Sequence, residues 1–175
     1  ESFRYQELVE LFDVDRRTIA DSYLPALDQL YLLSGVTEYD NSRPRGVRLF
    51  LRDTGLVTAL ADGDASTVRN DFDREADLAR IAAFDHTMRF AYGMNASQGI
   101  DIVPSVQYWQ GRYGEVDFVF EIDETPVPIT MAYQSGMDEA IDAVEEFHTE
   151  YGTQVGFVVT GDVVSPSDEI EILED

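Results

Sequence analysis

Two carboxylates in this 175-residue sequence stand where apolar side chains are expected. Asp85 falls within a helical run of apolar residues, and Asp117 lies in a run that alternates like a β-strand. Carboxylates in such places can hold a metal ion or another ligand, or they can be hydrogen-bonded to backbone or water. Burial of two neighbouring acids raises the pKa of one of them, so a shifted pKa alone does not identify a catalyst.

Several other kinds of chemistry lack the residues they need. His86 and His148 have no histidine or cysteine partner at metal-ligand spacing, so we interpret both as ordinary helix residues. No Ser–His–Asp arrangement can be argued from them. The sequence has no cysteine, which excludes disulfides, zinc–thiolate sites and cysteine nucleophiles. All 12 basic residues are arginine, so a P-loop lysine and a Schiff-base lysine are both missing. Any ATP chemistry therefore belongs outside this chain.

Five of the 12 arginines fall in a short N-terminal stretch. Arg16 and Arg17 open a predicted helix, and Arg43, Arg45 and Arg48 surround a predicted hairpin. A winged helix contacts DNA phosphates and groove edges from such positions. The same arginines can instead pair with the acidic surface or with a neighbouring domain. Phosphate contacts weaken steeply with salt, so we favour a docking role over DNA binding.

The chain is strongly acidic, with 12 Lys+Arg against 35 Asp+Glu and a net charge of −23. Such a charge repels itself at 0.1 M salt, where the Debye length is about 10 Å, and is tolerable at molar salt, where it is about 3 Å. Disordered acidic chains have few aromatic residues, whereas 11% of this chain is aromatic. We predict a folded cytoplasmic protein of a halophile. No stretch is apolar enough to span a bilayer, no secretion signal opens the chain, and a start at Glu1 suggests a fragment.

The elements that must position these side chains predict an α+β fold. Residues 1–61 have the order helix, turn, helix, hairpin, which is that of a winged helix-turn-helix. The first helix is expected over 5–12, with Tyr5, Leu8, Val9 and Phe12 inward. The second is expected after an N-cap at Asp15, with Ile19, Tyr23, Leu27 and Leu30 inward and a kink or break at Pro25. Two short strands fill residues 35–53.

An acidic segment of small residues, 62–71, is the predicted linker to a second domain over 72–175. A long helix is expected there, with Leu78, Ile81, Asp85, Met88 and Tyr92 on one face. It is followed by strands over 102–109, 115–121 and 128–134, a helix over 137–151 that ends at Gly152, and a buried central strand over 155–160. In the second strand, Val116, Phe118 and Phe120 are expected opposite Glu115, Asp117 and Val119. Residues 169–175 either add an edge strand or remain loose.

Three short motifs follow one another at a recognisable spacing. Residues 49–56 read Leu-Phe-Leu-Arg-Asp-Thr-Gly-Leu, and residues 115–119 read Glu-Val-Asp-Phe-Val after the aromatic pair Tyr108–Trp109. Pro128–Ile129 opens the next strand. Together with the element order, these motifs resemble a restriction-endonuclease-like α/β core (helix, three strands, helix, strand), the PD-(D/E)XK nuclease fold. More narrowly, nearly the whole chain resembles the C-terminal region of archaeal and bacterial AAA-type ATPases that carry a DUF4143 domain.

In the nucleases of this fold, carboxylates hold a divalent metal ion and a lysine stabilises charge or positions the attacking water. The resemblance places Asp85 at the helix acid, Asp117 at the first strand acid, Thr130 at the second strand acid and Ala132 at the lysine. Thr130 and Ala132 carry no charge, so one metal ligand and the only cation are lost. Mg²⁺ gives up its waters reluctantly and is held poorly by such a set. Gln134, on the same predicted strand face, is the candidate polar stand-in.

The resemblance therefore implies a non-enzymatic regulatory or docking module C-terminal to an AAA-type ATPase domain, with a catalytically degenerate nuclease fold. The expected partner is the ATPase domain of the same polypeptide, another protein subunit, or DNA. We expect no membrane partner, and no cofactor in this chain. Two alternatives stay open: a nuclease that uses Mg²⁺ on Asp85, Asp117 and a third ligand, and a DNA-binding winged-helix regulator. An exposed apolar patch favours docking, an acidic pair at metal-bridging distance favours the nuclease, and a contiguous arginine face favours the regulator.

Overall fold

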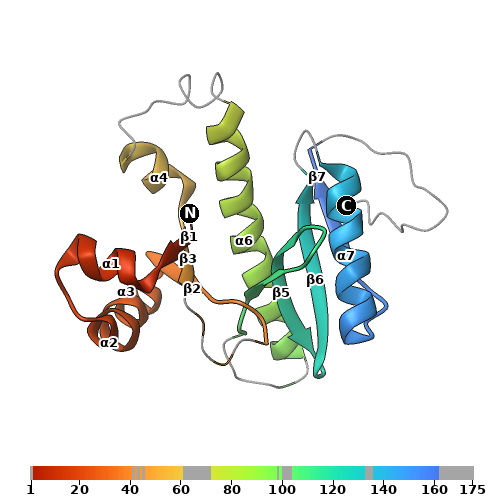
Figure 1. The fold of residues 1–175 in the computed structure, drawn as a ribbon, viewed down its shortest axis with the longest axis horizontal. Coiled ribbons are helices and arrows are strands. Elements are labelled where there is room, and N and C mark those ends of the chain that lie inside the picture. Colours follow the sequence, from red (N-terminus) through yellow and green to blue (C-terminus); the bar gives the residue numbers. More distant parts are fainter. Residues whose placement is uncertain are drawn as a thin grey trace.

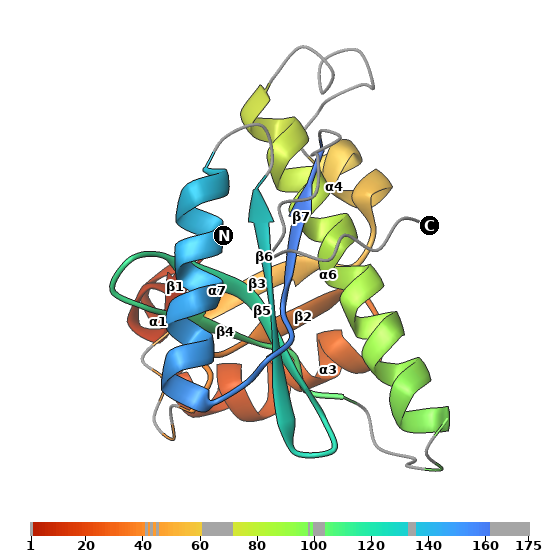
Figure 2. The same ribbon diagram turned by 90° about the vertical axis from the view of Figure 1, so that its right-hand side faces the viewer.

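The computed structural model describes residues 2–40, 42, 44, 46–60, 72–97, 99, 104–132 and 136–161. The described residues form an α+β fold, as predicted, with one three-stranded and one four-stranded sheet. A long helix, α6 (Phe72–Ser97), runs between the N-terminal elements and the larger sheet. A second helix, α7 (Met137–Tyr151), covers the other face of that sheet (Figures 1 and 2).

The N-terminal elements follow the order strand, helices, hairpin, short helix. They are β1 (Ser2–Arg4), α1 (Tyr5–Phe12), α2 (Arg16–Thr18), a π-helical turn (Ile19–Tyr23), α3 (Leu24–Gln29), β2 (Leu33–Val36), β3 (Gly46–Leu51) and α4 (Thr54–Leu60). In the small sheet β3 is central, antiparallel to both β1 and β2. The Asp15 carboxylate accepts a hydrogen bond from the Thr18 backbone N–H at 3.0 Å, which confirms the predicted N-cap. Pro25 lies in the first turn of α3, where its missing N–H costs little.

The inward faces predicted for the first two helices are only partly correct. Three of the predicted residues are buried: Tyr5, Leu8 and Ile19. Four are exposed over a third or more of their surface: Phe12, Tyr23, Leu27 and Leu30. The π-helical turn explains the error in the second helix, because it holds more residues per turn than an α-helix and rotates the apolar stripe away from the core.

The larger sheet has the strand order β4-β5-β6-β7. Its strands are β4 (Gln107–Gln110), β5 (Glu115–Ile122), β6 (Thr125–Ala132) and β7 (Phe157–Thr160). The first three are antiparallel, whereas β7 is parallel to β6, with α7 as the crossover. The element order from α6 onward is thus helix, three strands, helix, strand. Gly152 follows α7 with a φ of 69°, as predicted for its C-terminal stop.

Some element boundaries and positions differ from prediction. The strand β7 lies at the end of the described sheet rather than at its centre, and its Val159 side chain is 40% exposed. A run of apolar residues cannot distinguish a central strand from an outer strand beside a helix. On α6, Phe84 is the most buried aromatic residue and Tyr92 is exposed, so the inward face is rotated from the predicted one. The predicted linker over 62–71 and the segment 169–175 lie outside the described residues.

A β-bulge in β5 changes which side chains face each side of the sheet. The β4–β5 pairing shifts register between Gln107 and Trp109, so β5 has one residue more than β4 in this stretch. Asp117 bonds to an arginine of α6, and Phe118 packs against Phe84 of the same helix. Two consecutive residues therefore face α6, and the strict alternation predicted for this strand is wrong.

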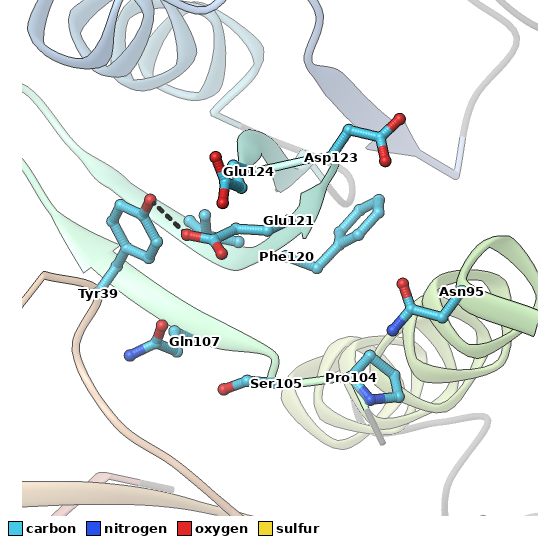
Figure 3. Close-up of a pocket in the computed structure, with 10 residues that line it drawn as sticks. Tyr39, Asn95, Pro104, Ser105, Gln107, Phe120, Glu121, Asp123 and Glu124 are labelled. Carbon is cyan, nitrogen blue, oxygen red and sulfur yellow. Dashed lines mark hydrogen bonds between the residues drawn. The ribbon is translucent and has the colours of Figure 1, made fainter. Parts of the chain in front are cut away.

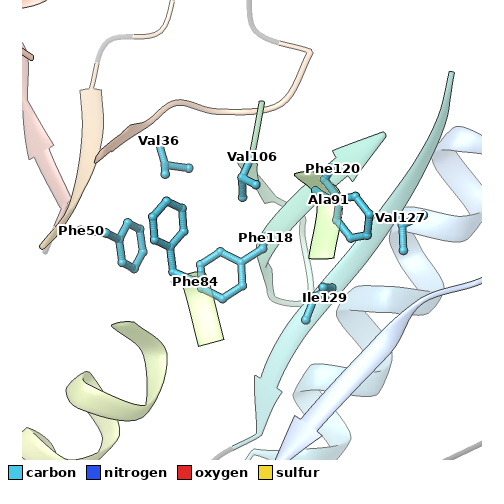
Figure 4. Packing of buried hydrophobic residues seen from close by; sticks show 9 residues of the cluster. All are labelled: Val36, Phe50, Phe84, Ala91, Val106, Phe118, Phe120, Val127 and Ile129. Atoms are coloured by element: carbon cyan, nitrogen blue, oxygen red, sulfur yellow. The ribbon is translucent and has the colours of Figure 1, made fainter. Parts of the chain in front are cut away.

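The two parts of the chain share one apolar core. The Phe84 ring stacks on Phe50 of β3 with centroids 4.6 Å apart, and it lies 5.8 Å from the Phe118 ring of β5 (Figure 4). Val36 of β2 joins the same cluster, together with Val106 at the entry to β4. Because residues from both sides of α6 fill this cluster, the N-terminal elements and the larger sheet pack as one body.

Backbone pairing also joins the two parts. The Tyr39 N–H donates to the Tyr108 carbonyl at 2.6 Å, and the Tyr108 N–H donates to the Thr37 carbonyl at 3.1 Å. These bonds form a parallel bridge between Glu38 and Tyr108 at the outer side of β4. The segment after β2 thus covers the β4 edge of the larger sheet.

Candidate functional site

Asp117, one of the two predicted site acids, is buried in the sheet and fully bonded. Its side chain is 3% exposed. One carboxylate oxygen accepts from the Arg80 Nε of α6 at 2.9 Å, and the other accepts from the Met131 backbone N–H of β6 at 2.8 Å. The carboxylate thereby takes the place of a strand carbonyl at the end of the β5–β6 ladder. An arginine side chain stands beside Asp117, where a nuclease of the resembled fold would hold a metal ion.

Burial raises the pKa of Asp117 above its ordinary value, and the Arg80 guanidinium and the Met131 N–H offset only part of that effect. A carboxyl with a raised pKa in the folded state favours folding below its unfolded pKa. That contribution is lost as the pH rises through the folded pKa. Arg80 is therefore the group that makes an ionised Asp117 tolerable at neutral pH.

Replacing Arg80 with alanine is expected to lower the free energy of unfolding by about 2–3 kcal/mol at pH 7, because it leaves a buried carboxylate without its cation. The pKa of Asp117 should rise further, so the loss should shrink as the pH falls below about 4, where the carboxyl becomes protonated in the unfolded as well as the folded state. Urea unfolding at several pH values measures this. Arg89→Ala on the same helix is the charge-matched control, and Arg80→Ala combined with Asp117→Asn should remove the pH dependence. A loss independent of pH would contradict the assignment.

Asp85, the second predicted site acid, lies in a different network. Arg52, just after β3, donates to one Asp85 oxygen from Nε at 3.2 Å and from Nη2 at 3.0 Å. Arg89 donates to the other oxygen at 2.7 Å. Arg52 also donates to the Ser34 hydroxyl at 3.3 Å, and Ser34 in turn donates to Asp28 at 2.5 Å. The Asp85 carboxylate therefore ties α6 to the N-terminal part.

The structure does not bring the predicted nuclease positions together on one face. Arg80, which bonds Asp117, and Asp85 are five residues apart on α6, a rotation of about 140° and a rise of about 7.5 Å. The β6 residues that flank Thr130, Ile129 and Met131, pack in the cluster on the α6 side. Side chains alternate along a strand, so Thr130 and Ala132 face α7, away from Asp117. Both are buried, and Gln134 lies outside the described residues.

β6 supplies no second acid and no lysine to the Asp117 side of the sheet, and Glu115 of β5, whose charge also raises the pKa of Asp117, is bonded to Arg48. The residues of β6 that share that side are apolar, and Thr130 makes only a long contact of 3.5 Å with the Glu115 carbonyl. Within the described ranges, no group of three or more His, Cys, Asp or Glu side chains is placed to hold a metal ion. In the same ranges, no helix is both long and apolar enough to cross a membrane.

The arginines predicted to contact DNA do not form one exposed face in the part of the chain that the structure describes. Arg16 donates to the Pro44 carbonyl at 3.0 Å and lies over the Tyr5 ring. Arg17 is exposed and pairs with Asp21 of the next turn. Arg48 is largely buried: its guanidinium bonds both Glu115 oxygens, at 3.1 and 2.8 Å, and lies 3.7 Å from the centre of the Tyr108 ring. Arg43 and Arg45 lie outside the described residues.

A separate hollow of about 670 Å³ opens beside the turn between β5 and β6 (Figure 3). The Tyr39 hydroxyl donates to Glu121 at 3.0 Å on one side of it, and Asp123 and Glu124 of the turn add two carboxylates. Burial raises the pKa of Tyr39, and the hydrogen bond to Glu121 raises it further. The tyrosine therefore stays a hydrogen-bond donor at any physiological pH. Asp117 does not line this hollow.

Sequence reasoning missed the three arginines that bond the two acids. Arg52 falls within the 49–56 motif without a role assigned to it, and Arg80 falls in no motif. Only Arg89, four residues after Asp85, stands at a spacing that predicts an ion pair along a helix. The other two bonds join residues 33 and 37 positions apart, which only the packing of α6 against both sheets brings together. In comparisons with known proteins, no family model, no curated protein and no solved structure matches this chain.

Proposed function

We propose that the chain is a non-enzymatic docking module, a winged helix followed by a nuclease-like core that has lost catalysis. Its proposed partner is an AAA-type ATPase domain, on the same polypeptide or on another subunit. The connectivity of the elements supports this architecture. In the N-terminal part a strand, helices and a hairpin close a three-stranded sheet of order β1-β3-β2, which suits a winged helix. From α6 onward, the element order is that of the resembled nuclease core.

The bonding of the two acids supports loss of catalysis. A metal-dependent nuclease needs oxygen ligands that converge on one ion and leave positions open for water and substrate. Asp117 is buried with both oxygens occupied by Arg80 and by a backbone N–H, and Asp85 is bonded by Arg52 and Arg89. Internal cations thus occupy both carboxylates, which supports the proposed loss of metal binding.

An exposed apolar face on the N-terminal helices carries the docking proposal. Three exposed side chains recur at helical spacing along this stretch, Tyr23, Leu27 and Leu30, with exposed fractions of 51%, 36% and 66%. Tyr31, in the turn after α3, is 74% exposed. A winged helix usually places a helix after its turn in the DNA groove, and here α2, the π-helical turn and α3 form one continuous helix that begins with Arg16 and Arg17. Its C-terminal part, α3 (sequence LPALDQ), has no basic residue and contains Asp28. Apolar side chains in this position suit a protein surface better than a phosphate backbone.

Two variants of matched exposure test the docking face. Leu30 in the exposed face and Leu60 at the end of α4 are 66% and 67% exposed. With a separately expressed AAA-type ATPase domain, Leu30→Ser should weaken binding in calorimetry by roughly tenfold or more, whereas Leu60→Ser should leave it unchanged. Equal effects of both variants, or no binding by the unaltered chain, would contradict the proposal.

A labelled duplex, titrated from low to molar salt with and without Mg²⁺ or Mn²⁺, tests the two alternatives. Metal-dependent cleavage that is lost in Asp117→Ala, with the fold intact by circular dichroism, would establish the nuclease. Binding without cleavage, lost when Arg16 and Arg17 are changed to alanine, would establish the DNA-binding regulator. The proposed docking module predicts neither cleavage nor duplex binding at molar salt.

A further inference from the structure

An apolar groove of about 570 Å³ lies between α6 and the β6–β7 side of the larger sheet. The helix α6 packs over β5 and β3, and among the described residues it leaves β7, the last strand of the sheet, partly uncovered. Small side chains line the helix side of the groove: Ala79, Ala82 and Ala83. Two larger apolar side chains border the same groove and project into solvent, Phe90 with 50% and Val159 with 40% of its surface exposed. A hollow and a ridge therefore lie next to each other on one face.

The groove also lacks the acidic side chains that are frequent in the rest of the chain. One residue in five is Asp or Glu, since 35 of the 175 residues are acidic. None of the described residues that line the groove is Asp, Glu or Arg, and its only titratable side chain is His86. Outer strands are usually protected from association by charged residues or proline. Residues 157–159 of β7, Phe-Val-Val, carry neither.

We propose that this groove is the interface of a two-fold symmetric dimer of this chain. A two-fold axis beside β7 lets Phe90 and Val159 of each copy fill the alanine-lined hollow of the other, which satisfies ridge and hollow at once. The distribution of charge favours the same face. Two chains of net charge −23 repel each other, and this repulsion is weakest where the surfaces in contact carry no acidic side chains. The remaining long-range repulsion makes the dimer depend on salt.

Sedimentation velocity or light scattering of the full chain, over a range of concentrations at 0.1 M and 2 M KCl, tests the proposal. The expected result is a folded monomer or weak dimer at low salt and a dimer at high salt. Val159→Arg should raise the dimer dissociation constant at 2 M KCl by roughly tenfold or more, because it buries two cations in the interface. Val155→Arg, at a 58% exposed position just before β7 and outside the groove, is the matched control.

Three results would overturn the proposal. One is a monomer at 2 M KCl at every concentration. Another is a dimer that survives Val159→Arg but is lost in Leu30→Ser, which would place the interface on the exposed face of the N-terminal helices. The third is a dimer dissociation constant that rises as much in Val155→Arg as in Val159→Arg, which would show an effect of added charge that is not specific to the groove. Because no ATPase domain is needed, failure here is independent of the proposed docking function.

Discussion

Replacing Phe84 with alanine is expected to lower the free energy of unfolding by about 3–5 kcal/mol, a large share of the roughly 5–15 kcal/mol that holds a domain folded. The ring is 1% exposed and lies between Phe50 of the N-terminal part and Phe118 of the larger sheet. Its removal opens a cavity at the place where the two parts of the chain share their core. The N-terminal elements should then unfold at a lower urea concentration than the sheet.

Two probes separate these events. The single tryptophan, Trp109, packs against Phe147 on the α7 side of the sheet and reports on that region alone. Far-ultraviolet circular dichroism reports on the helices of both parts. The two transitions should coincide in the unaltered chain and separate in Phe84→Ala. Tyr92→Ala, at a 52% exposed position on the same helix, should cost less than about 1 kcal/mol. Coincident transitions in Phe84→Ala would show that other contacts hold the two parts together.

Salt is expected to change stability more than most single substitutions. Repulsion within a chain of net charge −23 favours the unfolded state at low ionic strength, and KCl screens it. The midpoint of thermal unfolding should rise by about 10 °C or more between 0.1 M and 2 M KCl, with most of the rise before about 1 M, where the Debye length is near 3 Å. The ion pairs at Asp117, Asp85 and Glu115 oppose this trend only weakly, because at least one partner of each is largely buried and is screened less.

The control for the salt experiment is sucrose, which is excluded from protein surfaces but does not screen charge. Stabilisation by KCl that sucrose does not reproduce identifies repulsion between acidic side chains as the cause. The proposed dimer is also salt-dependent, so Val159→Arg should be measured beside the unaltered chain at low protein concentration. A midpoint that does not change from 0.1 M to 2 M KCl would rule out the salt adaptation predicted from composition.

Elements with regular periodicity could be predicted from the sequence. The helix α7 shows this best: its inward residues recur every three or four positions, and Gly152 ends it in the left-handed conformation. Two irregular features made the predicted inward faces of the second helix and of β5 wrong. The π-helical turn after Thr18 rotates Tyr23 and Leu27 toward solvent, and the β5 bulge turns Asp117 toward α6. Both insert one residue into a regular repeat, and neither has a sequence signature that periodicity can detect.

The two acids of the candidate site could be predicted from the sequence, but the arginines that bond them could not. Asp85 and Asp117 stood out because a carboxylate interrupts an apolar pattern. In the structure their side chains are only 17% and 3% exposed. Their partners could not be predicted, since Arg52 and Arg80 reach them only through the packing of α6 against the two sheets. The face of Thr130 also depended on the unpredicted bulge, because the orientation of β5 determines which side of β6 lies beside Asp117.

The bridge between Glu38 and Tyr108 gives the larger sheet two unlike edges. On the β4 side, backbone groups of Tyr108 are already bonded to Thr37 and Tyr39, so a strand from another molecule cannot be added there. Polymerisation through strands requires two open edges on each molecule. A sheet with one covered edge can add a strand from another molecule only at its other edge, which allows a pair of molecules but not a fibre. The segment that covers the β4 edge is therefore expected to stop strand-by-strand growth of a fibre on that side of the sheet.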